Sequence, residues 1–235
     1  MLKYQKIAKN IEQYIKENNL KPGDKLPSLE EFVTYFDAGK STIRRSLGLL
    51  ENKGSLYQQH GSGIFVRSQK LKGYIDLSFN RGFAYEFSDY EVTNETLVVE
   101  TKKASSEVAH NLNITTSDLI QYVKRLIYID GKPIVIEESH YLESVVPRLD
   151  EKITAASIFT YLQKDLHLKF GFSDAYLIID KLNKEEAKLL KLRVGDPRPC
   201  KISTFYLTDR TPFNYSKVVF HYEQAKFFIP LIKNV

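Results

Sequence analysis

The chain has 235 residues and a formal net charge of +5, with 43% hydrophobic and 27% charged residues, as in ordinary folded soluble domains. Its charged, amphipathic start MLKYQKIAKNIEQ is not a secretion signal, no run is long and apolar enough to cross a bilayer, and the single cysteine, Cys200, excludes an intramolecular disulfide. The sequence therefore excludes a disulfide-stabilised secreted domain and favours a cytoplasmic protein that does not interact with membranes.

The positive charge is concentrated in the first third of the chain. Residues 1–72 carry 13 lysines and arginines against seven acidic residues, whereas the remaining 163 residues carry 21 basic and 22 acidic side chains. Such asymmetry indicates a module that binds a polyanion, joined to a nearly neutral module. A chance cluster of solvated lysines would give the same count, so the predicted elements must decide between the two.

Two helices are predicted in the first 36 residues. The first has apolar residues at i, i+3 and i+4 spacing: Tyr4, Ile7, Ile11, Tyr14 and Ile15. The turn residues KPGD at 21–24 end it. Ser28 and Glu31 have the spacing of a capping box and begin the second helix. That helix is expected to bury Leu29, Phe32, Val33 and Phe36.

A third helix begins at Lys40, after a short turn at residues 37–39, and a hairpin with the tip Gly61-Ser62-Gly63 follows it. This order is that of a winged helix-turn-helix, in which the N-terminal end of the third helix reaches base edges in the major groove. Here that end carries Lys40, Ser41, Thr42, Arg44 and Arg45. Arginine can bond both acceptors of a guanine edge, and short hydroxyls suit phosphate oxygens. The expected anchors of the wing are Leu56, Phe65 and Val66.

Solvated arginines and an ordinary hairpin turn would explain each of these motifs singly, but not their order. The segment from residue 3 to 66 resembles the GntR family of bacterial transcription regulators through PGDKLPS at 22–28, KSTIRRSL at 40–47, LLENKG at 49–54 and HGSGIFV at 60–66. The resemblance implies that Lys40, Thr42 and Arg44 contact DNA and that His60 and Gly61 enter the minor groove. The chain departs from the family's usual residues at Glu30, Gly39 and Ser62, so the operator sequence does not follow from the resemblance.

The remainder of the chain alternates strands and helices after a basic linker at residues 67–75. Strands are predicted at 97–103, 120–129, 134–141, 174–182, 201–207 and 213–222, and helices at 106–112, 157–166 and 184–190. Residues 107–118 resemble residues 185–196, and each segment is followed by a strand, a turn with aspartate, a proline and a second strand. A helix-hairpin unit used twice predicts a pseudo-symmetric α+β domain around a largely antiparallel sheet.

No catalytic or metal-binding constellation is predicted, and no cofactor is expected. The histidines beyond the wing have no His or Cys at metal-ligand spacing: His110, His140, His167 and His221. Glu137 and Glu138 are neighbours on a strand and point to opposite faces, unlike a paired acid and base. One of them can face inward and form an ion pair with Arg125 on the neighbouring strand.

This second part resembles the UTRA ligand-binding domain of the HutC-type branch of GntR regulators, which shares its fold with chorismate lyase. The matching stretches are YVKRLIYIDGKPIVIEESHY at 122–141, SIFTYLQKDLHLKFGFS at 157–173 and TPFNYSK at 211–217. The resemblance implies that Arg125, Glu137, Ser157 and Asn214 line an effector pocket, with Arg125 holding an anionic group. Ile127 stands where a second arginine is usual and Asn214 where an acid is common, so a small anion other than a sugar phosphate could be the effector.

The sequence thus predicts a winged helix-turn-helix domain at residues 1–68, a linker at 69–90, and an antiparallel-sheet effector-binding and dimerisation domain at 91–235. We expect a homodimeric regulator, in the simplest case a repressor of a carbohydrate operon, that binds a palindromic operator in double-stranded DNA. A small anionic effector such as a sugar phosphate would release it. The alternatives are a chorismate-lyase-like enzyme with an attached DNA-binding head, and a DNA-coating protein with little sequence preference.

Overall fold

The computed structural model describes residues 2–67, 71–77, 82–83, 87 and 89–229. These form two compact units: one holds the described residues up to Leu77 together with those from Lys226, and the other holds the described residues between 82 and 225. Parts of the predicted linker (69–70, 78–81, 84–86 and 88) and the end of the predicted second domain (230–235) lie outside the described residues. Within the described ranges, no helix is long and apolar enough to span a membrane.

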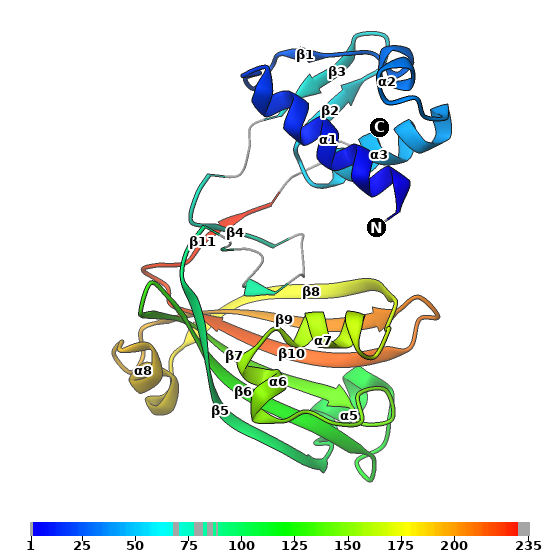
Figure 1. Ribbon diagram of the computed structural model, residues 1–235. Helices are drawn as coiled ribbons and strands as arrows, with labels where there is room; N and C mark the ends of the chain where they lie inside the picture. Colours follow the sequence, from blue (N-terminus) through cyan, green and yellow to red (C-terminus); the bar gives the residue numbers. More distant parts are fainter. Residues whose placement is uncertain (1, 68–70, 78–81, 84–86, 88, 230–235) are drawn as a thin grey trace. The chain divides into compact units, whose positions relative to one another are not determined.

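Three helices and a small sheet make up most of the first unit (Figure 1): α1 (Lys3–Glu17), α2 (Leu29–Phe36) and α3 (Lys40–Asn52). The antiparallel sheet has the order β1-β3-β2, with β1 at Lys25–Leu26, β2 at Leu56–Gln59 and β3 at Gly63–Val66. A separate parallel pair joins β4 (Tyr74–Asp76) to β11 (Lys226–Phe228). The sequence did not predict β1, β4 or β11, because two or three residues are too few to show a period.

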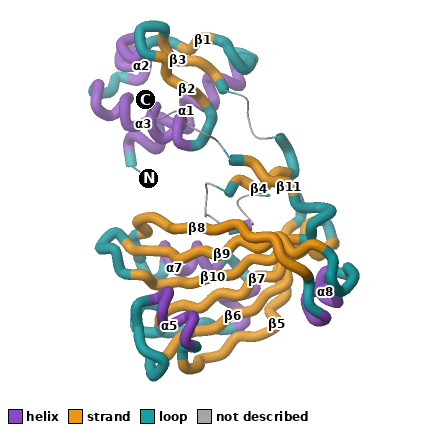
Figure 2. The backbone as a smooth tube through the Cα atoms, turned by 180° about the vertical axis from the view of Figure 1, so that it is seen from behind, coloured by secondary structure: helices purple, strands orange, loops and turns teal. Residues whose placement is uncertain are grey.

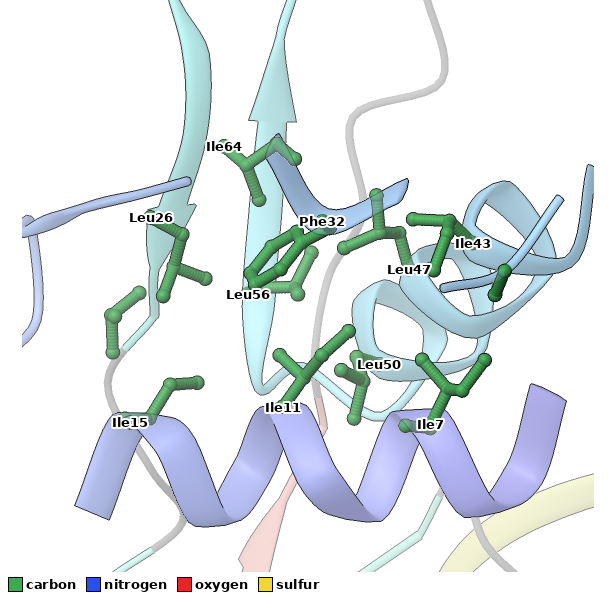
Figure 3. Close-up of a cluster of buried hydrophobic side chains, with 13 residues drawn as sticks. Ile7, Ile11, Ile15, Leu26, Phe32, Ile43, Leu47, Leu50, Leu56 and Ile64 are labelled. Carbon is green, nitrogen blue, oxygen red and sulfur yellow. The ribbon is translucent and has the colours of Figure 1, made fainter. Parts of the chain in front are cut away.

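The core of the first unit confirms the predicted apolar stripe of α1. Ile7, Ile11 and Ile15 of α1 are buried, with Ile7 toward the side chains of α3, Ile11 toward Phe32 and Ile15 toward Leu26 (Figure 3). Of the four residues that α2 was expected to bury, only Phe32 is buried, and Leu29, Val33 and Phe36 are partly buried against the core. The predicted capping box of α2 is present, since Ser28 Oγ accepts from the Glu31 amide at 3.2 Å and Glu31 Oε2 accepts from the Ser28 amide at 2.7 Å. The capping box fixes the start of α2, and α1, α2 and α3 bury their apolar sides in one common core.

The wing confirms two of its three predicted anchors. Leu56 and Val66 are buried, whereas Phe65 is only half-buried and stacks on Tyr57, with 5.3 Å between the ring centroids. The prediction for Phe65 was wrong because neighbouring residues of a strand point to opposite faces, so Val66 and Phe65 cannot both face the core. Ile64 fills the second core position of this strand.

A six-stranded antiparallel sheet in the order β5-β6-β7-β10-β9-β8 forms the second unit (Figure 2). Its strands are β5 (Val92–Lys103), β6 (Leu119–Ile129), β7 (Lys132–Leu142), β8 (Phe170–Lys181), β9 (Pro197–Leu207) and β10 (Pro212–Phe220). Each contains most of a predicted strand. The first residues of β5, β8 and β9, VTNE, FGFS and PRPC, were missed because they contain asparagine, glycine and proline, which are depleted in strands.

Helices cover both faces of this sheet. On one, which we call the α6–α7 face, α6 (Glu151–Ala155) and α7 (Ile158–Lys164) pack over Val123, Tyr141 and Phe213 (Figure 1). On the opposite face, α5 (Ser106–Leu112) packs near Tyr215 and α8 (Lys184–Leu190) near Leu126 (Figure 2). The sequence predicted α5, α7 and α8 but missed α6, which has only five residues.

The structure confirms the internal repeat. The units β5-α5-β6-β7 and β8-α8-β9-β10 have the same element order, and they meet where β7 pairs with β10. The helix of each unit ends in a left-handed residue, Asn113 with φ 53° and Lys191 with φ 57°. Asp118 then accepts from the Thr115 amide at 2.7 Å, as Asp196 accepts from the Arg193 amide at 3.0 Å.

Candidate functional site

The N-terminal half of α3 presents its predicted DNA-contacting residues on one exposed side. The opposite side is buried through Ile43, Leu47 and Leu50. The Ser46 hydroxyl lies 2.9 Å from the carbonyl oxygens of both Tyr4 and Thr42, which links α3 to α1. Exposed on the other side are Lys40, Ser41, Arg44 and Arg45, while Thr42 is half-buried.

Two of the exposed basic residues already have partners within the unit. Lys40 Nζ lies 2.6 Å from Glu30 Oε1, and this hydrogen bond lowers the pKa of the Glu30 carboxyl. The Arg45 guanidinium lies 4.1 Å from the centroid of the Tyr4 ring, a cation–π contact that orients it. Arg44, which lies next to Arg45 on α3, is exposed. Arg44 is therefore the best placed of the three to read a base.

Replacing Glu30 with glutamine is expected to raise affinity for random DNA several-fold. The change frees Lys40 for a phosphate, so the dependence of log affinity on log salt should steepen by about one unit. Fluorescence anisotropy over a salt series measures this. Glu12→Gln is the matched control, because it removes the same charge from the Glu12–Lys53 ion pair of this unit, 3.3 Å long. If both variants gained the same affinity for random DNA, the change in net charge alone would explain the gain, and Lys40 would have no specific role.

The wing tip lies at an exposed turn. The Ser62 amide donates to the Gln59 carbonyl at 3.0 Å, and Gly61 has a φ of +74°, which favours glycine. His60 is exposed beside it. The wing is also tied to α3, because Glu51 accepts from both the amide and the side chain of Gln58 at 2.9 and 2.8 Å. This link, which sequence reasoning missed, fixes the wing relative to the recognition helix.

On the α6–α7 face of the second unit, Arg125 of β6 lies directly opposite Glu137 of β7. Its Nε and Nη2 both donate to Glu137 Oε2, with 3.1 Å from Nε, and both residues are only 7% exposed. Arg125 Nη1 donates to the carbonyl oxygens of Thr154 and Ala156 at 2.8 and 3.3 Å. The predicted ion pair is confirmed, and four of the five guanidinium N–H groups are in use.

The other two predicted effector residues lie at different distances from this pair. Ser157 follows Ala156 directly and caps α7, its hydroxyl accepting from the Thr160 amide at 3.3 Å. Asn214 lies opposite Tyr141, four residues along β10 from the residue that faces Glu137, or about 13 Å at strand spacing. The structure therefore joins Arg125 and Glu137, brings Ser157 close to them, and leaves Asn214 apart.

A group of hydroxyls lies between these positions on the same face. Ser139, Ser216 and Ser203 are directly opposite one another on β7, β10 and β9. Ser139 Oγ donates to Glu137 Oε1 at 3.2 Å, whereas Tyr141 Oη and Ser203 Oγ are buried with no hydrogen-bond partner among the described residues. Unpaired buried hydroxyls cost free energy and mark where a ligand oxygen would be accommodated. Serines amid apolar strand residues were the only sequence signal of this group.

Glu137 and Glu138, which are neighbours on β7, point to opposite faces of the sheet and each form an ion pair there. Glu138 pairs with Lys124, whose Nζ is 3.1 Å from it and 2.6 Å from Glu185, while Glu137 pairs with Arg125 on the α6–α7 face. The described ranges also contain no group of three His, Cys, Asp or Glu side chains that could hold a metal ion.

Comparison with known proteins identifies both units. The family described as "Bacterial regulatory proteins, gntR family" matches residues 3–66, and the UTRA domain family matches residues 88–226. The chain belongs to the GntR family of transcription regulators. It is a ligand-responsive regulator of the GntR/UTRA type, and the predicted α+β fold with an N-terminal helix-turn-helix is confirmed.

Two relatives of this GntR/UTRA regulator are informative. It is 48% identical over 229 residues to the uncharacterized HTH-type transcriptional regulator YydK of Bacillus subtilis, and the match covers 97% of each chain. The crystal structure of YydK aligns over both whole chains with a TM-score of 0.85 and 46% identity. The chain is 28% identical over 226 residues to the mannosyl-D-glycerate transport/metabolism system repressor MngR of Escherichia coli, covering 95% of this chain and 93% of MngR. Both families and both relatives are regulators rather than enzymes.

Proposed function

We propose that this GntR-family regulator is a homodimeric repressor of a carbohydrate operon that leaves its palindromic operator when a small anionic effector binds. Residues 1–68 would bind DNA in the cytoplasm, and residues 91–235 would bind the effector and dimerise. Residues 69–90 would link these two domains. The observation that carries the proposal is the side of α3 that exposes Lys40, Ser41 and Arg44 while its other side is fixed in a core. MngR, which its name describes as a repressor of a sugar-derivative system, supports the same role.

In the proposed complex, α3 lies in the major groove and the wing tip in the minor groove. Arg44 would read a guanine edge, since its charge is exposed and its planar fork fits two acceptors. The remaining predicted residues of α3 would hold phosphates: Lys40, Ser41, Thr42 and Arg45. His60 and Gly61 would approach the backbone of the neighbouring minor groove, where the absence of a side chain at Gly61 allows close contact.

Replacing Arg44 with alanine is expected to cost about 1–3 kcal/mol on the cognate operator and much less on random DNA. Arg45→Ala is the matched control, because it removes the same charge from the neighbouring residue that stacks on Tyr4. That variant should weaken both duplexes about equally, as a phosphate contact does. Anisotropy titrations at one fixed salt concentration measure all four affinities. Equal losses for Arg44→Ala on both duplexes would reduce Arg44 to a phosphate contact.

The proposed effector site is the α6–α7 face around Arg125 and Glu137, with Ser157 and Asn214 at its margins. The ion pair is neutral as a whole, so an anion cannot simply add to a free guanidinium. The anion would accept a hydrogen bond from the one unused N–H of Arg125, or it would displace the carbonyl oxygens of Thr154 and Ala156 as acceptors of the Arg125 Nη1 hydrogens. Replacing them would move α6, and this gives effector binding a structural consequence. A ligand's hydroxyls would find partners in Tyr141 and Ser203.

A thermal-shift screen of phosphorylated and non-phosphorylated sugars, followed by operator-release titrations, tests this proposal. A phosphorylated sugar that raises the melting temperature and releases the operator would support the anionic effector. Release by the neutral sugar alone, without its phosphate, would overturn the role given to Arg125.

A further inference from the structure

Helix α6 is held on the sheet by side chains of two strands. It has only five residues, and a helix of this length is not stable by itself. The carbonyl groups at the C-terminal end of a helix also have no partner within it. Here the carbonyl groups of Thr154, Ala155 and Ala156 accept hydrogen bonds from the edge strand β5 and from Arg125 of β6 (Figure 1). The position of α6 therefore depends on donors that lie outside it.

Asn94 of β5 supplies one of these donors. Its Nδ2 lies 3.2 Å from the carbonyl oxygen of Ala155 and 3.5 Å from that of Ala156. Asn94 lies opposite Ile127, two residues from Arg125 along β6, so the Asn94 and Arg125 side chains both point to the α6–α7 face. The carbonyl oxygen of Ala156 is thus shared by two donors from neighbouring strands.

Thr96 of β5 holds α6 through the side chain of Thr154, which is fully buried. Thr96 lies directly opposite Arg125, and its Oγ1 is 2.8 Å from Thr154 Oγ1. The Thr154 hydroxyl has one proton, which the carbonyl oxygens of Asp150 and Glu151 accept at 3.0 and 3.2 Å. Thr96 is therefore the donor in its contact with Thr154. A valine at this position keeps the shape of the side chain and removes that donor.

We infer that Asn94 and Thr96 are positioning residues of the effector response. They hold residues 154–156 in the arrangement without effector, and so they set the effector concentration at which the operator is released. The inference rests on the proposed function, in which an anion displaces main-chain carbonyl oxygens from Arg125. Such a displacement must also break the contacts from β5, because they hold the same segment. Ser157, which directly follows this segment and caps α7, would move with it.

The direction of the expected effect follows from this arrangement. Contacts that exist only before α6 moves favour the operator-bound state, so their loss makes the movement easier. A variant that lacks one of them should release the operator at a lower effector concentration. Its operator affinity without effector should stay nearly unchanged while the moved state is a minority. One neutral hydrogen bond corresponds to a roughly three- to tenfold lower concentration.

Hydrogen exchange of the full chain without ligand measures whether the two side chains hold α6. Thr96→Val and Asn94→Ala are each expected to speed exchange of the amides of residues 150–156 roughly three- to tenfold. Thr93→Val is the matched control, since Thr93 is exposed on the same strand and points to the opposite face. Thr96→Ser retains the hydroxyl and should exchange like the wild type. Unchanged exchange in Thr96→Val and Asn94→Ala would overturn the inference.

Operator release measures the role in regulation, with glucose 6-phosphate, fructose 6-phosphate and mannose 6-phosphate as probes and the free hexoses as controls. With a phosphate that releases the wild type, Thr96→Val should respond at a roughly three- to tenfold lower concentration. Thr93→Val and Thr96→Ser should respond like the wild type. An unchanged concentration together with faster exchange would show that Asn94 and Thr96 only stabilise α6, which would overturn the inference.

The failure of the proposed function would look different. If none of these phosphates released the wild type, the anionic effector proposed above would be contradicted, and the role of Asn94 and Thr96 in the response would fail with it. Faster exchange in the two variants would still show that β5 holds α6.

A disulfide tests the same contact in the opposite direction. Thr96→Cys combined with Thr154→Cys replaces two hydroxyl oxygens that lie 2.8 Å apart by sulfur atoms, whose bond is about 2 Å long. The native Cys200 is buried, so it does not compete for oxidation. The oxidised variant should stay on the operator at phosphate concentrations that release the wild type, and reduction should restore release. Release of the oxidised variant at the wild-type concentration would overturn the inference.

Discussion

Replacing Arg125 with alanine is expected to lower the free energy of unfolding by about 3–5 kcal/mol, because Glu137 then remains as a buried carboxylate without its cation. The carbonyl oxygens of Thr154 and Ala156 lose their donor in the same variant, so α6 is loosened as well. Urea unfolding followed by circular dichroism measures the loss. A variant as stable as the wild type would contradict the ion pair described here.

A double variant separates the structural role of this pair from a role in effector binding. Arg125→Met combined with Glu137→Leu removes both charges, and replacing a buried ion pair by apolar residues of similar volume is often neutral or stabilising. We expect the double variant to fold, to bind operator like the wild type, and to stay bound at effector concentrations that release the wild type. Normal release would show that the two residues only stabilise the fold and that the effector binds elsewhere.

The second prediction with a large expected effect concerns the two DNA-binding domains of the proposed dimer. A fragment of residues 1–72 is expected to bind the full operator about 10²–10⁴-fold more weakly than the whole chain, since joining two heads makes the second contact intramolecular. The buried cluster of the first unit lies entirely between Ile7 and Val66, so the fragment retains its core. Anisotropy titrations at one salt concentration provide the comparison.

A duplex with a single half-site is the control for this comparison. The fragment and the whole chain should bind it with similar affinity, because only one head can engage. If the two proteins also bound the full operator equally well, two-headed recognition would be contradicted.

Local patterns in the sequence predicted most of the fold. The stripe through Ile7, Ile11 and Ile15 identified α1, and the boxes at Ser28 and Asn183 located the starts of α2 and α8, because helix period and capping depend only on near neighbours. The repeat predicted the symmetry of the second unit. Helix α6 and strands β1, β4 and β11 were missed, since elements of two to five residues form through tertiary contacts and carry no period of their own.

The candidate site was predictable only where its partners are close in sequence. Arg125 and Glu137 lie on the two strands of one hairpin, so their closeness could be expected, but a β-bulge between Ile127 and Tyr128 shifts the register by one residue and places them directly opposite one another. The carbonyl groups of Thr154 and Ala156 come from a helix about thirty residues further on. The row of Ser139, Ser203 and Ser216 depends on strand order across the sheet. Neither contact leaves a local signature, because long-range register is set by the whole packed sheet.

The most direct test of the proposed recognition by two DNA-binding domains is to select, from DNA duplexes of random sequence, those that the full-length protein binds. This experiment requires neither a known operator nor a known effector. Two identical heads related by a twofold axis should enrich an inverted repeat whose half-sites are about one helical turn, ~34 Å, apart. Arg44→Ala should enrich a motif with weaker preference at one position of each half-site. Enrichment of a single half-site without a repeat, or no enrichment over random DNA, would contradict the account.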